Sequence, residues 1–218
     1  IFSQGYGQTE SGPQICALPR KDHQVLDGTV EEQKVLSSCG QPSLGVHVRV
    51  VDEENHDVVP GTVGEIIAQS DSLMVEYWKR PDETREVLID GWLHTGDLGY
   101  YDEKGFIYIV DRKKDMIVTG GENVYSREVE EVLYRHPAIG EVAVVGIPDP
   151  VWVEQVHAVV VLERDAVATE NEIIAFCKEH LASYKAPKSI EFVESLPKNA
   201  QGKILKKEIR KRYRTNKQ

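Results

Sequence analysis

The stretch of sequence that divides this chain is Asp111-Arg112-Lys113-Lys114-Asp115. Its five charged residues lie between two apolar stretches, and charge alone is also typical of a solvent-exposed hairpin turn. The residues before it favour strands, whereas those after it alternate between helices and strands. We therefore expect a domain boundary here, with one domain over residues 1–111 and a second over residues 112–218.

The first half is predicted to be mainly β. Val46, Val48 and Val50 alternate with polar residues, which is the period of a half-buried strand. Further strands are expected over residues 63–69 and 106–110. Arg80-Pro81-Asp82 favours a short helix that continues to Leu88.

The second half combines both kinds of element. Ser126 is a plausible N-cap for a helix that ends before Pro137. The expected order after it is strand, strand, helix, strand and basic helix, over residues 142–147, 156–162, 170–181, 190–193 and 203–213. The fold class is therefore predicted to be α+β: the end of a large, mainly β domain followed by a small α+β domain.

Composition excludes several classes of protein. Hydrophobic residues make up 40% of the 218 residues, which is enough for a packed core despite a net charge of -10. No apolar run approaches the roughly 20 residues that a membrane span needs. Three cysteines form no metal-binding or disulfide pattern, and we find no signal peptide. A cytoplasmic location is the expectation.

The charge is unevenly distributed. From Lys198 onward there are nine Lys or Arg residues and a single acid, Glu208, so this segment carries +8 and the rest carries -18. Such a tail suggests a nucleic-acid-binding module as one alternative. Against it, Leu205, Ile209 and Tyr213 are spaced as the buried face of a packed helix, so no nucleic acid is expected.

Four polar clusters, each beside glycine, are candidates for chemistry: Tyr6–Glu10, Gly91–Asp97, Asp111–Asn123 and Pro197–Lys203. In the first, a hydroxyl next to a carboxylate suits a phosphate and Mg²⁺. Asp97 follows a tight turn and can accept hydrogen bonds from a ribose diol. Lys203 can bring positive charge to a phosphate when its loop closes. Each cluster alone is also compatible with an ordinary turn, and His94 is interpreted as structural.

Together the four clusters, in this order, resemble the adenylate-forming superfamily of acyl-CoA synthetases, peptide-synthetase adenylation domains and luciferases. The stretches Tyr77–Pro81 and Gly121–Tyr125 look most like fatty-acyl-CoA synthetases. The resemblance implies an AMP-forming acid–thiol ligase of fatty-acid metabolism. It would use ATP, Mg²⁺ and coenzyme A, and its other substrate would be a small carboxylic acid.

The resemblance also implies roles for individual residues. Tyr6 would stack on adenine beside Gly7 and Gln8, Thr9 would contact the phosphates, and Glu10 would bind Mg²⁺. Asp97 and Arg112 would bind the ribose, and Ile109 would pack near the nucleoside. Lys114 would be the hinge, and Lys203 would stabilise the adenylation transition state. The pantetheine channel would be lined by Gly120, Gly121 and Glu122.

Two departures from the family pattern stand out. The Ser/Thr/Gly-rich phosphate loop is not found among the 218 residues, so we expect it upstream of Ile1 and expect this chain alone to be inactive. Lys206 stands where many members carry Arg, which puts a role for it in doubt. Two alternatives stay open: an adenylation domain that loads a carrier protein, and a non-catalytic fragment that binds a partner, such as the missing N-terminal segment.

Overall fold

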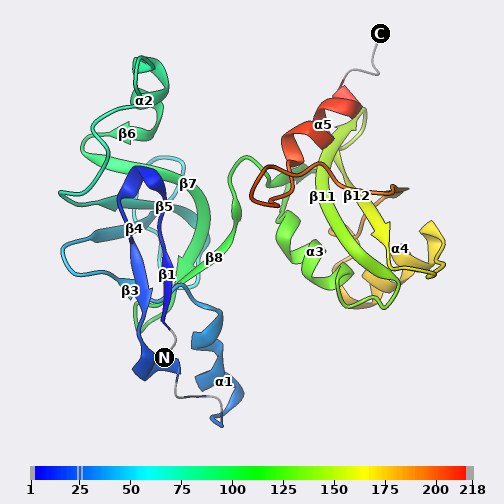
Figure 1. The fold of residues 1–218 in the computed structure, drawn as a ribbon, viewed down its shortest axis with the longest axis horizontal. Helices are drawn as coiled ribbons and strands as arrows, with labels where there is room; N and C mark the ends of the chain where they lie inside the picture. The colour runs from blue at the N-terminus through cyan, green and yellow to red at the C-terminus, as the bar shows by residue number, and fades with distance from the viewer. Residues whose placement is uncertain (1–2, 24, 26, 215–218) are drawn as a thin grey trace. The chain divides into compact units, whose positions relative to one another are not determined.

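The computed structural model describes residues 3–23, 25 and 27–214 (Figure 1). The chain divides into two units, Ile1–Lys113 and Lys114–Gln218. The division lies inside the charged stretch, between Lys113 and Lys114. Lys217, which contributes to the basic tail, lies outside the described residues. We describe each unit by itself.

The first unit is built from two antiparallel sheets, as expected for a mainly β segment. The three-stranded sheet has the order β1 (Gln4–Tyr6), β2 (Cys16–Leu18), β3 (Gln41–Pro42). The five-stranded sheet has the order β4 (His47–Val51), β5 (Gly64–Gln69), β7 (Trp92–Tyr101), β6 (Leu88–Ile89), with β8 (Ile107–Arg112) also paired to β7. Two short α-helices, α1 (Val30–Gln33) and α2 (Pro81–Val87), and three 3-10 turns join the strands: Thr9–Ser11, Arg20–His23 and Lys34–Ser37.

Both sheets contribute to one core. Ile15 and Cys16 come from the segment of the small sheet, and Val50, Ile66 and Ile107 come from the large sheet. All five side chains are at most 3% exposed. Because the small sheet buries its apolar residues against the large one, the first unit holds its strands in place by packing as well as by backbone pairing.

Strand β7 contradicts the expectation of a turn over Gly91–Asp97. Trp92–Tyr101 form one ten-residue strand, and the irregularity is a bulge inside it. His94 pairs with Ile67 and Leu98 pairs with Glu65, so three residues of β7 face a single residue of β5. Gly96 has φ +69°, the left-handed region that glycine enters at little cost. The sequence pattern did not reveal this strand, because the bulge interrupts the two-residue alternation of a strand and the residues there are polar or glycine.

The second unit is a five-stranded sheet covered by helices on both faces. The strand order is β10 (Glu122–Val124), β9 (Ile117–Thr119), β12 (Val153–Leu162), β11 (Ile139–Asp149), and β13 (Ser189–Phe192) pairs with β12 in parallel. The helices are α3 (Ser126–Leu133), α4 (Glu170–His180) and α5 (Lys206–Arg214). Figure 1 shows α3 and α5 on either side of β11, and both helices contact this strand.

The β-branched run of β11 is explained by its two buried faces. Val142 and Val144 belong to the cluster that includes residues of α3 and α4. Ala143 and Val145, which alternate with them, pack with Ile209 of α5 instead. A strand that is covered on both sides reads as a continuous apolar run, so the expected α+β architecture is confirmed in this unit.

Several helix boundaries differ from the expectations. Ser126 is not an N-cap: it is the first residue of α3, and its buried hydroxyl accepts a 2.7 Å hydrogen bond from Lys206 Nζ. Helix α5 begins at Lys206 rather than Lys203, and Leu205 is exposed rather than inward. Helix α4 matches its prediction closely, because Thr169 and Glu172 form a reciprocal capping box at its start.

A buried histidine joins three elements of the second unit. His157 of β12 has Nδ1 2.7 Å from Ser189 Oγ on β13 and Nε2 2.9 Å from the Tyr213 hydroxyl on α5. The Tyr213 hydroxyl in turn donates to Glu191. Burial lowers the pKa of His157 from its ordinary value, against the opposing charges of Glu191 and Glu170.

We predict that acidification weakens this junction. The native pKa of His157 is depressed, so the unfolded chain binds the proton first. The contribution to stability is therefore complete above about pH 6.5 and is lost as pH falls toward the native pKa, by at most about 1.4 kcal/mol per pH unit. Hydrogen exchange of the β12 and β13 amides between pH 7.5 and 5.5 measures the loss. His157→Gln should flatten this dependence, whereas the exposed control His180→Gln should leave it unchanged; equal slopes in all three proteins would refute the assignment.

Candidate active site

A single buried carboxylate gathers several of the predicted residues of the first unit. Asp97 of β7 is 6% exposed and directly follows the bulge residue Gly96. The Tyr6 hydroxyl donates a 2.8 Å hydrogen bond to Asp97 Oδ2, and Gln8 Nε2 donates another of 2.8 Å to the same oxygen. Gln8 Nε2 also donates to the Thr95 carbonyl at 2.9 Å. The segment that follows β1 is thereby fixed to the bulge of β7.

Arg112 approaches the other oxygen of this carboxylate. It pairs with Asp97 in the register of β7 and β8, and its Nε lies 3.4 Å from Asp97 Oδ1. The Arg112 side chain is about half exposed, at 51%. The hydrogen bonds from Tyr6 and Gln8 therefore use Oδ2, while Oδ1 faces the half-exposed side chain of Arg112.

Tyr6 is a hydrogen-bond donor in this network. Burial, followed by the charge of Asp97, raises the pKa of Tyr6, so its hydroxyl keeps its proton. Sequence reasoning assigned this residue only a stacking ring, and the hydrogen bond to Asp97 was not anticipated. Little in the sequence indicated this hydrogen bond, because 91 residues separate Tyr6 from Asp97.

Thr9 and Glu10 lie in the 3-10 turn after Gln8. Thr9 is exposed, and the Glu10 carboxylate accepts a 2.8 Å hydrogen bond from the Tyr77 hydroxyl through Oε1. Burial and the neighbouring Glu10 raise the pKa of Tyr77 to about 12. Within the described residues, no hydrogen bond links Glu10 to the Asp97 network. Tyr77 was missed as a partner, although it stands in the stretch that most resembled fatty-acyl-CoA synthetases.

Glu65 supports the bulge from the neighbouring strand β5. It is 8% exposed and accepts hydrogen bonds from Lys113 Nζ at 2.9 Å and from the Gly96 amide at 3.1 Å. His94 Nδ1 lies 3.3 Å from the same carboxylate. Burial by itself raises the pKa of Glu65, but the bonds from Lys113 and His94 outweigh it and the pKa is lowered. Sequence reasoning did not single out Glu65.

The two remaining predicted residues of this unit border the same region. Ile109 of β8 is half-buried, lies opposite Gly99 and packs on the core. Gly7 approaches the backbone of residues 13–14 closely: a Cβ there would lie 3.1 Å from the Pro13 carbonyl oxygen. Any larger side chain at this position would need that backbone to move.

In the second unit, Gly120 and Gly121 form the two-residue turn of the β9–β10 hairpin. Their φ angles are +61° and +86°, as a type I′ turn requires. A Cβ on Gly120 would lie 2.7 Å from Cε3 of Trp152, so the indole ring covers this glycine. Glu122, at the start of β10, is exposed and pairs with Thr119.

Lys203 is exposed on a loop whose backbone is fixed by Asn199. Asn199 Oδ1 accepts hydrogen bonds from the amides of Gln201 and Lys203, at 3.0 and 2.9 Å, and the Asn199 amide donates to the Lys203 carbonyl at 2.9 Å. Lys114, the first residue of the second unit, is also exposed. The structure thus gathers Tyr6, Gln8, Asp97 and Arg112 in the first unit. The residues predicted as hinge, transition-state and channel groups belong to the second unit.

Other features of the described residues add no second site. One group of possible metal ligands, Asp52, Glu54 and His56, lies in the exposed turn between β4 and β5. Asp52 Oδ1 already accepts two backbone amides there, at 2.9 Å each. None of the helices of residues 3–23, 25 and 27–214 is long and apolar enough to cross a membrane.

Comparisons with known proteins give the family. Residues 1–78 match the model of AMP-binding enzymes, and residues 128–203 match the model of the AMP-binding enzyme C-terminal domain. This chain belongs to the AMP-binding, adenylate-forming enzymes. The suspected resemblance is thereby confirmed.

Two relatives are named for different acceptors, coenzyme A and an acyl-carrier protein. A medium/long-chain-fatty-acid–CoA ligase of Mycobacterium tuberculosis is 47% identical over 220 residues, 98% of this chain and 37% of that protein. A fatty acid–[acyl-carrier-protein] ligase of Streptomyces coeruleorubidus is 44% identical over 97% of this chain and 40% of that protein. The chain therefore spans about 40% of the length of these relatives.

A solved structure places an adenylate in the same fold. The o-succinylbenzoate CoA synthetase of Bacillus subtilis, in complex with its acyl-adenylate intermediate, matches with a TM-score of 0.82 at 36% identity. The match covers 95% of this chain and 40% of that protein.

We predict that Gly120 and Gly121 respond differently to alanine. Gly121→Ala should cost only the left-handed backbone penalty of about 1–2 kcal/mol, since no heavy atom lies within 4 Å of its Cβ. Gly120→Ala should cost more and displace Trp152. Chemical denaturation and Trp152 fluorescence, in a Trp78→Phe, Trp92→Phe background, test this. Equal costs with unchanged fluorescence would contradict the packing described.

Proposed function

We propose that this chain supplies the nucleoside-binding edge and the mobile C-terminal domain of an ATP-dependent ligase that joins a carboxylic acid to coenzyme A. The observation that carries the proposal is the Asp97 network. A buried carboxylate at a strand bulge, fixed by Tyr6 and Gln8 and flanked by Arg112, suits recognition of a ribose. The match to an acyl-adenylate-bound structure supports the same chemistry.

The reaction would take place in two steps. An oxygen of the acid attacks the α-phosphorus of ATP, and pyrophosphate leaves with the bonding electron pair. The thiol sulfur then attacks the acyl carbon, loses its proton to solvent, and AMP leaves. Neither step needs a covalent protein nucleophile, because positioning and charge stabilisation supply the catalysis.

Each unit would contribute its own groups. In the first, Asp97 and Arg112 bind the ribose, Ile109 packs near the nucleoside, and Tyr6 and Gly7 border the adenine. In the second, Lys203 stabilises the adenylation transition state from an exposed loop. Rotation about Lys114 would then present the channel residues Gly120, Gly121 and Glu122 to the pantetheine arm.

Glu10 fits the proposed Mg²⁺. Its Oε1 is bonded to Tyr77, which orients the carboxylate and leaves Oε2 for a cation. Mg²⁺ is commonly held by one or two carboxylates together with substrate phosphates, so a single carboxylate at this place is sufficient. The ion would neutralise phosphate charge when bound. Thr9, exposed beside Glu10, would contact those phosphates.

The acceptor has a second candidate. The 44% identical carrier-protein ligase has 40% of its length matched, against 37% for the CoA ligase, so a phosphopantetheinyl carrier protein is the alternative to free coenzyme A. Assaying both acceptors with the same acyl adenylate separates the two. A fatty acid is our proposed substrate, since both quoted relatives are named for fatty acids.

The role of Asp97 predicts a change in nucleotide selectivity. We use the complete polypeptide, meaning this chain joined to the upstream segment that the resemblance implies. Asp97→Asn should raise KM for ATP by about 10–100-fold, because a hydrogen bond to a charged group is worth about 1.5–3 kcal/mol. It should also abolish discrimination against 2′-deoxy-ATP. The exposed control Asp57→Asn should change neither quantity, and full discrimination in Asp97→Asn would refute the ribose assignment.

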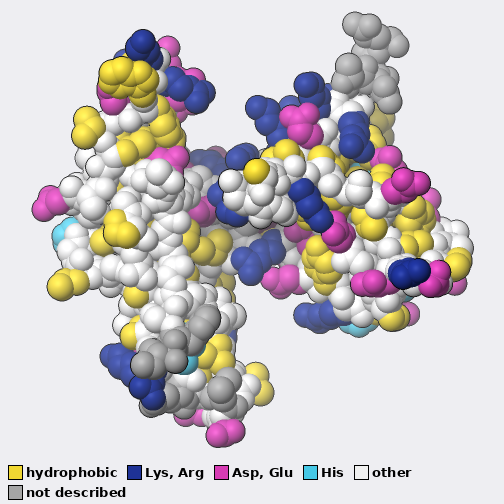
Figure 2. Space-filling view, viewed as in Figure 1, with side chains coloured by type: hydrophobic (Ala, Val, Ile, Leu, Met, Phe, Trp, Pro, Cys, Tyr) yellow, Lys and Arg dark blue, Asp and Glu magenta, His cyan; other side chains and the backbone are white. Residues whose placement is uncertain are grey.

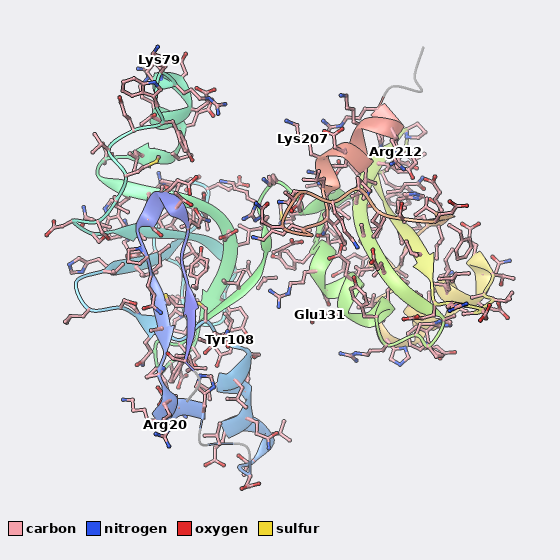
Figure 3. The ribbon with its side chains drawn as sticks, in the orientation of Figure 1. Arg20, Lys79, Tyr108, Glu131, Lys207 and Arg212 are labelled. Carbon is pink, nitrogen blue, oxygen red and sulfur yellow. The ribbon has the colours of Figure 1, made fainter. Side chains whose placement is uncertain are left out.

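Lys203 should act in the first step only. In the complete polypeptide, Lys203→Ala should reduce acid-dependent ATP–pyrophosphate exchange by about 10²–10³-fold. Thioester formation from supplied acyl adenylate should stay within about 3-fold. Lys207→Ala is the matched control, since Lys207 projects from α5 and is exposed (Figure 3). Equal losses in both steps would contradict the rotating domain, and exchange by this chain alone would contradict its expected inactivity.

A further inference from the structure

The two residues that flank Lys114 are each held by an ion pair within their own unit. Lys113 ends the first unit, and Asp115 lies one residue inside the second. Lys113 bonds to Glu65, and Asp115 bonds to Arg210. The side chain of Lys114 itself is exposed and has no hydrogen bond or ion pair to another described residue. The backbone is thus fixed immediately before and immediately after this one position.

On the first side, Lys113 is attached to the bulge by two bonds. Its amide donates to the Gly96 carbonyl at 2.8 Å, and its Nζ donates to Glu65 at 2.9 Å. Glu65 also accepts from the Gly96 amide. Glu65 therefore joins the last residue of the first unit to the residue that precedes the nucleoside carboxylate Asp97.

On the second side, Asp115 is attached to the helix that follows the Lys203 loop. Arg210 Nη1 lies 2.7 Å from Asp115 Oδ1, and both side chains are only 13–14% exposed. Lys206, one turn earlier in α5, lies 2.7 Å from Glu130 of α3. The start of the second unit and the helix after Lys203 are consequently parts of one rigid body.

The carboxylates of these two pairs differ from those of the surface pairs: the Glu65 and Asp115 side chains are 10% and 13% exposed, although the Lys113 side chain is 51% exposed. Arg127 and Glu131 on α3 are 56% and 58% exposed, and Figure 3 shows Glu131 at the surface of this helix. Exposed pairs of this kind contribute about 0–1 kcal/mol. By contrast, a buried carboxylate that loses its cation is strongly destabilised, so Glu65 and Asp115 restrict their partners far more firmly.

We propose that the Glu65–Lys113 and Asp115–Arg210 pairs are brackets that confine bending to Lys114, and that Glu65 and Asp115 are therefore positioning residues. This inference rests on the proposed function, because rotation about Lys114 belongs to it. With both flanks fixed, a change in the backbone angles of one residue moves Lys203 along a defined path. Loosening the second bracket would let Lys203 lose its placement without altering the chemistry of any group that touches substrate.

Hydrogen exchange of this chain tests the brackets without any assay of activity. In Glu65→Gln, exchange of the Lys113 amide should accelerate by about 10-fold, while amides in the middle of β4 and β5 keep their rates. In Asp115→Asn, the Ile209 amide of α5 should accelerate similarly. Asp57→Asn and Glu131→Gln remove a carboxylate from an exposed pair and should change neither rate. Unchanged rates in both bracket variants would overturn the proposal.

A milder variant covers the case in which Glu65→Gln fails to fold. Lys113→Met removes a cation that is 51% exposed and leaves Glu65 bonded to Gly96 and close to His94. Trypsin cleavage after Lys114 should be faster in Lys113→Met than in the parent chain, because the flank is released. Lys113→Arg restores the cation and should return the cleavage rate to that of the parent. An equal rate in all three proteins would count against the first bracket.

Activity of the complete polypeptide then tests positioning. Asp115→Asn should lower kcat of ATP–pyrophosphate exchange by about 10-fold, with KM for ATP and the thioester step within about 2-fold. A merely structural role would lower both steps equally, through loss of folded protein, and that result would overturn the proposal. If the parent protein catalyses neither step, the proposed function fails, and the exchange rates alone decide whether the brackets exist.

Discussion

The bulge at Gly96 is the constraint on which the first unit's site depends. With φ +69°, it lets three residues of β7 face one residue of β5. Its amide is held by Glu65, its carbonyl accepts from Lys113, and the next residue, Asp97, is turned into the network of Tyr6 and Gln8. One irregular step in a strand therefore fixes both the Asp97 carboxylate and the end of the unit.

Hydrophobic periodicity predicted the parts of the fold that tertiary packing leaves regular. Val46–Val50 gave β4 almost to the residue, and the two β-branched runs became β11 and β12 because both of their faces are buried. The same reasoning failed at β7, whose glycines and polar residues suit a bulge as well as a turn. It also failed at Ser126, because the helix begins at this residue, one position later than an N-cap, and its hydroxyl accepts a hydrogen bond from Lys206, 80 residues away.

The candidate site shows the same limit. The resemblance assigned Asp97 and Arg112 to one ligand group, and the sheet register places these two residues opposite each other. Tyr77 and Glu65 could not be predicted, since each acts through one hydrogen-bonded partner far away in the sequence. A motif identifies the groups that meet a ligand, whereas the groups that hold those residues in place are determined by strand pairing and burial.

The charge of the C-terminal segment takes on a different meaning once its partners are known. Figure 2 shows Lys and Arg side chains gathered over α5. Yet Lys198, Lys206 and Arg210 are paired with Glu141, Glu130 and Asp115 within the second unit. Those cations hold α5 and its preceding loop on the domain, so a formal charge of +8 overstates what is offered to solvent. Lys203, by contrast, is anchored through its backbone by Asn199 and keeps its exposed ammonium group. In the proposed mechanism, this cation on a fixed backbone belongs to a body held through Arg210 to the residue after Lys114, and it would act on a phosphate at one orientation of the domain and withdraw at another.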